Sequence, residues 1–173
     1  MKRDQPEKRD TLFLEQQRLR QKWIWLLVGI VAAIAWAAFI QQVVFGNPVG
    51  NRPTPNYVVW LIFILFGIGM PWLMYFIKLV TRLDSSHLTV RLRPLLTRKI
   101  PLKEIASFEA RTYRPLREFG GWGLRFSPRY GRAYNMHGNR GVQLILSNDD
   151  KILVGSQHAD ELAEALRKSM RRS

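Results

Sequence analysis

The sequence contains no cysteine among its 173 residues. Disulfide cross-links, thiolate metal sites, iron–sulfur clusters and thiol nucleophiles are therefore excluded. No Asn-x-Ser/Thr acceptor for glycosylation occurs either. Acidic residues are few, because 13 Asp and Glu stand against 27 Lys and Arg and give a formal net charge of +14. An excess of this size predicts an acidic partner, which we expect to be anionic lipid, nucleic acid or an acidic protein face.

Charge is also missing from two long stretches of the chain. Residues 23–45 and 57–77, which are 23 and 21 residues long, contain no Asp, Glu, Lys or Arg. As helices they extend about 34 and 31 Å, enough to cross a hydrocarbon core of about 30 Å. The first is too long for the apolar region of a signal peptide, and both are longer than most buried core helices. We predict a transmembrane hairpin, in which the absence of ionisable residues argues against an ion or proton pathway.

The basic residues around these stretches predict the orientation of the hairpin. Residues 1–22 hold seven Lys and Arg, whereas the connecting loop at 46–56 holds only Arg52. Lys78 and Arg82 follow the second stretch directly. By the positive-inside bias, both ends of the protein face the cytoplasm. We expect residues 1–22 to form a basic juxtamembrane segment that becomes helical from residue 11 onward.

Small residues recur along the two predicted helices. Gly29, Ala33 and Ala37 stand four residues apart on the first helix and form a stripe that allows close approach of another helix. We expect this stripe, together with Gly67, to pack inside the hairpin, and contact with another subunit is the alternative. Gly67, with Gly69 and Pro71, also predicts a loosened or kinked second helix.

Residues 82–173 form the predicted polar domain, with 18 Lys and Arg against 9 Asp and Glu. Alternating apolar and polar residues predict short strands, most clearly at Leu88–Val90–Leu92 and Val142–Leu144–Leu146. Ser156 is expected to cap a final helix that has Asp and Glu in its first turn and Arg and Lys in its last. The seven expected strands lie at 88–93, 96–100, 105–113, 123–126, 132–136, 141–147 and 151–155.

Several motifs in this domain resemble the bacterial pleckstrin-homology-like family. They are Ile-Pro-Leu-Lys-Glu-Ile at 100–105, Gly-Gly-Trp-Gly at 120–123, Gly-Asn-Arg-Gly-Val at 138–142 and Val-Gly-Ser at 154–156, followed by the helix at 160–166. The resemblance implies an α+β membrane protein, in which two transmembrane helices precede a seven-stranded antiparallel β-barrel or sandwich capped by a C-terminal helix. It also implies a location in the bacterial cytoplasmic membrane and a role in binding or scaffolding.

The segment at 111–132 is the most unusual part of the domain. It contains six arginines and a single acid, with aromatic residues between them. Arginine presents a planar fork that suits phosphate or carboxylate and that stacks on aromatic rings. A solvated, charge-biased loop is the simpler interpretation, and an anionic headgroup or a protein partner is the functional one. The candidate binding residues are Arg111, Arg114, Arg117, Arg125, Arg129, Arg132 and Trp122.

No pattern in the sequence assembles a catalytic site, so we expect no enzyme activity and no cofactor. The three histidines are scattered, and with no cysteine we expect no metal site. Without a recognition helix or a known motif, nucleic acid is not the expected partner. We predict a membrane-anchored binding or scaffolding module that uses the lipid bilayer, anionic headgroups or a membrane or cytoplasmic protein. The alternative is an accessory subunit of a larger membrane complex. The sequence does not predict the oligomeric state.

Overall fold

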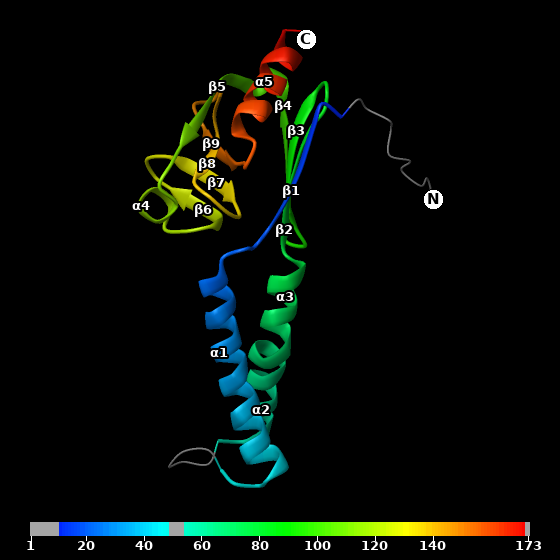
Figure 1. Ribbon diagram of the computed structural model, residues 1–173, viewed down its shortest axis with the longest axis vertical. Helices are drawn as coiled ribbons and strands as arrows, with labels where there is room; N and C mark the ends of the chain where they lie inside the picture. The colour runs from blue at the N-terminus through cyan, green and yellow to red at the C-terminus, as the bar shows by residue number, and fades with distance from the viewer. Residues whose placement is uncertain (1–10, 49–53, 172–173) are drawn as a thin grey trace, which may run out of the picture. The chain divides into compact units, whose positions relative to one another are not determined.

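The computed structural model describes residues 11–48 and 54–171, which form two compact units (Figure 1). The helical unit is Leu19–Ile77, and the β unit combines the residues up to Arg18 with those from Lys78 onward. The first ten residues of the predicted basic segment, and Arg52 of the predicted loop, lie outside the described residues. The β unit is therefore built from two pieces of chain that flank the helical unit in sequence.

Two long apolar helical segments form the helical unit, as the sequence predicts. Both Lys22–Val44 and Asn56–Phe76 are long and apolar enough to cross a membrane. Each segment includes a stretch of π-helix, in which the hydrogen bonds reach one residue further than in an α-helix. The first segment comprises α1 (Lys22–Phe39) and η1 (Ile40–Val44), and the second comprises α2 (Asn56–Ile62), η2 (Phe63–Gly69) and α3 (Met70–Phe76).

Aromatic side chains join the two helical segments. The Phe39 ring stacks on the Phe63 ring with centroids 4.2 Å apart, and Trp36 meets Phe63 edge-on at 4.7 Å. The indole Nε1 of Trp36 also donates a hydrogen bond to the carbonyl oxygen of Gly67 at 3.3 Å. Gly67 lies within η2, so the expected loosening of the second helix is observed, and Trp36 satisfies one of its carbonyl groups.

The β unit contains two sheets, and the first is a simple antiparallel meander. Its strand order is β1-β2-β3-β4, so β1 and β4 are its edges. The second sheet has the order β5-β8-β9-β7-β6 and includes one parallel pair, β7 with β9. The strands are β1 (Phe13–Arg18), β2 (Lys78–Leu83), β3 (His87–Arg93), β4 (Leu96–Pro101), β5 (Ile105–Thr112), β6 (Gly123–Ser127), β7 (Gly131–Asn135), β8 (Arg140–Leu146) and β9 (Lys151–Gly155).

All seven predicted strands are present, but the predicted seven-stranded antiparallel barrel is wrong. The described residues contain nine strands in two separate sheets, and they do not close into a barrel. The parallel pair arises because β8 and β9 form a hairpin, and β9 lies between β8 and β7. The α+β class and the C-terminal helix α5 (Ala159–Met170) are confirmed.

The helix predicted at 11–22 is also wrong, because Phe13–Arg18 forms strand β1. It pairs antiparallel with β2, from Phe13 opposite Leu83 to Arg18 opposite Lys78. The side chains of β1 that are buried are polar, Glu15 and Gln17, so the strand lacks the alternation of inward apolar residues that marks β3. The same pairing shows that β2 begins four residues before the predicted domain start at residue 82.

Helix α5 covers one face of the second sheet and completes the core. It packs against β5 and β8 through Leu162 and Leu166, both fully buried. The expected cap, Ser156, is not the N-cap, because the helix begins at Ala159 and His158 precedes it. The hydroxyl of Ser156 instead accepts the His158 N–H at 3.0 Å and supports the turn before the helix. The acidic first turn and the basic last turn are as expected.

Asp84 stabilises the turn between β2 and β3, and this gives a prediction for acid conditions. Its Oδ1 accepts hydrogen bonds from the N–H groups of Ser86 and His87, at 3.0 and 2.7 Å, and from the Ser86 hydroxyl at 3.1 Å. Burial alone would raise the pKa of Asp84, but these hydrogen bonds outweigh it and hold the pKa below its ordinary value of 3.8. The charged form is therefore the one that stabilises the fold.

Asp84→Asn is expected to destabilise the full chain by about 1 kcal/mol at neutral pH. The Asp84 contribution is complete above the unfolded pKa of 3.8 and is lost as pH falls through the lower folded pKa. The difference between wild type and variant should therefore shrink as pH falls from about 5 to about 2. Thermal melting in detergent measures it, with Asp150→Asn as the matched turn control. A difference that stays constant with pH would contradict the role of the charge.

Candidate functional site

The arginine-rich segment begins with a short helix, α4 (Pro115–Phe119), whose ends are set by local sequence. Pro115 suits the first helical turn because its missing N–H has no helical partner there. Glu118 Oε1 accepts the N–H of Arg114 at 2.7 Å, and Gly120 ends the helix in the left-handed region at φ 71°. The glycine motif at 120–123 therefore forms a turn after a short helix.

A small aromatic cluster holds α4 against the second sheet. Tyr113 and Phe119 meet edge-on with ring centroids 6.0 Å apart, and both are buried with Ala133 and Leu153. Tyr130 packs against this cluster from the side. Burial raises the pKa of the Tyr113 phenol above its ordinary value of 10.0. The helix thus rests on an apolar base, with Pro115 and Phe119 buried and Leu116 and Arg117 exposed.

A hollow of about 520 Å³ opens beside α4, and we call it the α4 groove. Arg114 and Arg117 are exposed at its rim, while Trp122 is half-buried. The Trp122 Nε1 donates to the carbonyl oxygen of Gly138 at 2.9 Å, which fixes the indole against the β7–β8 turn. The lining residues are Tyr113, Arg114, Pro115, Leu116, Arg117, Trp122 and Asn139.

Arg111, a predicted site residue, has a structural role instead. Its guanidinium forms an ion pair with Glu118 at 2.8 Å and donates to the Gln143 side-chain oxygen at 3.1 Å. The same group lies 5.5 Å from the centre of the Tyr130 ring. Half-buried and already bound to a carboxylate, Arg111 connects α4 to β8 and is poorly placed to bind an external anion.

The other predicted arginines are exposed but do not form one cluster. Arg125 donates from Nε to the Trp122 carbonyl oxygen at 3.0 Å, and Arg129 lies over the Tyr130 ring at 5.5 Å. Arg132 projects from β7. The structure therefore brings Arg114, Arg117 and Trp122 together at the α4 groove, and places Arg125, Arg129 and Arg132 on the β6–β7 hairpin.

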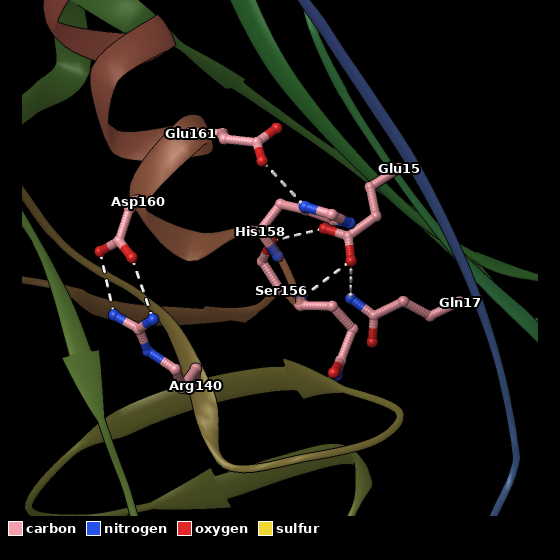
Figure 2. Close-up of polar contacts among 8 residues, drawn as sticks. Glu15, Gln17, Arg140, Ser156, His158, Asp160 and Glu161 are labelled. Carbon is pink, nitrogen blue, oxygen red and sulfur yellow. Dashed lines mark hydrogen bonds and ion pairs between the residues drawn. The ribbon is translucent and has the colours of Figure 1, made fainter.

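Sequence reasoning missed a buried polar cluster around Glu15, which Figure 2 shows. The Glu15 carboxylate accepts the Ser156 hydroxyl at 2.5 Å, the Gln157 N–H at 2.8 Å and the Gln17 side-chain amide at 3.1 Å. Gln17 also donates to the carbonyl oxygen of Gly155 at 2.9 Å. Two of these hydrogen bonds join β1, in the first sheet, to the segment between β9 and α5, a third joins it to the last residue of β9, and the fourth lies within β1.

The Glu15 cluster resembles a catalytic Ser–His–Glu set in composition but not in geometry. Ser156 is fully buried and its hydroxyl donates to Glu15, whereas the His158 ring pairs with Glu161 at 3.0 Å. A nucleophilic serine needs a base at its hydroxyl and access to substrate. The polar run at 15–18 has no alternation that marks a strand, and the partner residues of the cluster lie about 140 positions away, so no local pattern indicated it.

The small-residue stripe of the first helix does not pack inside the hairpin. Gly29, Ala33 and Ala37 are exposed, and the buried residues of α1 are Val28 and Ala35. The helices meet through large aromatic side chains on another face, so the expectation of packing inside the hairpin is wrong for the stripe. Gly67, in contrast, is buried against Phe63 and Trp36, as expected.

Comparison with known proteins gives a family match. A model described as "Family of unknown function (DUF6141)" matches residues 3–171. No curated protein and no solved structure matches the chain, and no pleckstrin-homology-like family is identified. Across residues 11–48 and 54–171, no three His, Asp or Glu side chains gather into a group suited to a metal ion.

Proposed function

We propose that this chain, which belongs to the family of unknown function DUF6141, is a membrane-anchored binding module for anionic groups. The helical unit anchors it, and the α4 groove of the β unit binds the ligand. No catalytic step is part of this proposal. The two-sheet β unit with its C-terminal helix would serve as the pleckstrin-homology-like scaffold that the sequence motifs imply.

The length and surface of the helical segments support the anchoring. Their exposed side chains are predominantly large and apolar, which is unfavourable in water and favourable in lipid. Three residues separate β1 from α1, and Ile77 alone separates α3 from β2. Three residues reach at most about 10 Å. A β unit on such short connections would stay beside the bilayer, on the cytoplasmic side if the basic flanks determine orientation.

The exposure and ion pairing of Arg114 and Arg117 indicate the chemical class of the ligand. Both are exposed at the rim of the α4 groove, and among the described residues neither forms an ion pair. The one acid in this segment, Glu118, is already bound by Arg111. Two free guanidinium groups beside a fixed indole offer forked hydrogen bonds and a stacking surface. This chemistry suits a phosphate or carboxylate, from a lipid headgroup or from a soluble molecule.

Charge reversal at the α4 groove tests this function. We expect Arg114→Glu combined with Arg117→Glu to weaken binding of dihexanoyl phosphatidylserine at least about tenfold, since each basic group contributes about 1 kcal/mol. Calorimetry on the full chain in a neutral detergent measures it. Inorganic pyrophosphate, as a second probe, separates general phosphate binding from headgroup binding.

The matched control is Lys103→Glu combined with Lys151→Glu, which changes charge equally at exposed positions elsewhere on the β unit. This pair should leave the affinity near that of wild type. Equal losses in both variants would show that net charge, not the α4 groove, determines binding. Undiminished binding by the Arg114 and Arg117 variant would remove the α4 groove as the ligand site.

A role as accessory subunit of a larger membrane complex is the second candidate. The outward-facing stripe of Gly29, Ala33 and Ala37 favours it, because small residues let a helix of another protein approach closely. Affinity purification of the tagged protein from native membranes discriminates between the two functions. A stoichiometric membrane-protein partner would favour the subunit role, and its absence would favour the binding module.

A further inference from the structure

Strand β6 exposes apolar side chains in an unusual place. It lies at the edge of the second sheet, where it pairs with β7. Leu124 is 47% exposed and Phe126 is 69% exposed. These two positions alternate along the strand, so both side chains are on the same face of the sheet. An exposed apolar edge strand invites association unless something covers it or charge protects it.

The strand register shows which face this is. Leu124 is paired with Tyr134 of β7, Tyr134 with Val154 of β9, and Val154 with Val142 of β8. Residues paired across neighbouring strands in this way lie on the same face of the sheet. Helix α5 packs on this face where β5 and β8 lie, and there Val142 is fully buried. Leu124 and Phe126 therefore extend the apolar face of the sheet beyond the part that α5 covers.

Arginine accompanies these residues. Arg132 lies directly opposite Phe126 in the register, on the same face. Arg125 stands between Leu124 and Phe126 on the strand, so its side chain points to the opposite face, where it contacts the carbonyl oxygen of Trp122. Arg129 lies in the turn that follows, over the Tyr130 ring. All three arginines are exposed, and residues 123–135 contain no Asp or Glu. The β6–β7 hairpin thus combines two exposed apolar side chains with positive charge that no acidic residue of the hairpin neutralises.

We propose that this hairpin, residues 123–135, docks on an anionic phospholipid bilayer. Leu124 and Phe126 enter the interfacial region, Arg132 contacts the headgroup phosphates from the same face, and Arg125 and Arg129 add positive charge at this edge of the sheet. Exposed apolar side chains next to arginines suit a bilayer, because the apolar acyl chains of a membrane lie directly beneath its negatively charged headgroups. The inference rests on the proposed anchoring, which keeps the hairpin at the membrane surface, but it does not depend on the α4 groove.

The absence of cysteine makes the test direct, since one introduced cysteine carries the only label. Leu124→Cys and Phe126→Cys are labelled separately with an environment-sensitive dye, in the full chain within nanodiscs. One set of nanodiscs contains phosphatidylcholine alone and the other adds phosphatidylserine, and both include lipids brominated on the acyl chains as quenchers. Thr97→Cys, exposed on the β4 edge of the first sheet, is the matched control.

We expect quenching at positions 124 and 126 to rise severalfold with phosphatidylserine, while position 97 stays unquenched. Changing Arg125, Arg129 and Arg132 together to Glu should abolish the rise, and circular dichroism confirms that the variant is folded. Equal quenching at 97 and 126, or none at 124 and 126 in anionic lipid, would overturn the proposal and leave an acidic protein face as the partner. A label at Ala33→Cys should be quenched in both lipids, and its failure would instead remove the anchoring itself.

Discussion

Gly131→Ala is expected to lower the free energy of unfolding of the β unit by about 3 kcal/mol or more. Gly131 begins β7 with φ 79°, a conformation that costs an L-residue about 1–2 kcal/mol. A Cβ there would lie 2.6 Å from the carbonyl carbon of Lys151, at the start of β9. Because that neighbour is backbone, the parallel β7–β9 pair must separate, and overpacking of this kind costs about 1–3 kcal/mol more.

Chemical or thermal unfolding of the full chain in detergent, followed by circular dichroism, measures this loss. Gly120→Ala is the matched control, because Gly120 has a similar φ of 71° but a Cβ there would have no atom within 4 Å. It should cost only about 1 kcal/mol. Equal losses at the two glycines would show that backbone strain alone, and not the approach of β7 to β9, determines the effect.

The second large effect is expected at Glu15. Glu15→Ala removes the acceptor for the Ser156 hydroxyl and the Gln157 N–H, and Ser156 is fully buried. Each buried donor left without a partner costs about 1–3 kcal/mol, so we expect a loss of about 3 kcal/mol. Since these bonds join β1 to the segment before α5, the variant should also become sensitive to protease near residues 13–18.

Gln16→Ala is the control for this variant, because Gln16 is exposed on the same strand and should change stability by less than about 0.5 kcal/mol. The double variant of Glu15→Ala with Ser156→Ala should lose less than the sum of the two single changes, because the second change removes a donor that the first left unpaired. Strict additivity, or a Glu15→Ala no less stable than Gln16→Ala, would falsify the role assigned to this carboxylate.

The sequence predicted features that local patterns encode. The uncharged stretches identified both apolar helices, and the alternation at Leu88–Val90–Leu92 and Val142–Leu144–Leu146 identified β3 and β8. Strand β1 was missed because its inward residues, Glu15 and Gln17, are polar. They are buried only because Ser156, Gln157 and Gly155 supply partners from the far end of the chain.

For the candidate site, too, the sequence predicted what depends on nearby residues but not what depends on contacts between distant ones. Composition drew attention to the segment at 111–132, but the helix α4 within it was not predicted, although Pro115 and Gly120 are local signals for its start and end. Composition did not separate Arg111 from Arg114 and Arg117, because the ion pair with Glu118 and the contact with Gln143 depend on the folded sheet. In the same way, the exposure of Gly29, Ala33 and Ala37 depends on which face the aromatic residues of the hairpin use.

The register between Arg18 and Lys78 has a topological consequence for the intervening chain. Two paired residues occupy one aqueous compartment, so any membrane traversed by the polypeptide between them is traversed an even number of times. Two traverses satisfy this parity, and one does not. A deletion that leaves a single traverse would place Lys78 on the opposite side of the membrane from Arg18. Strand β1 could then no longer pair with β2 in the first sheet.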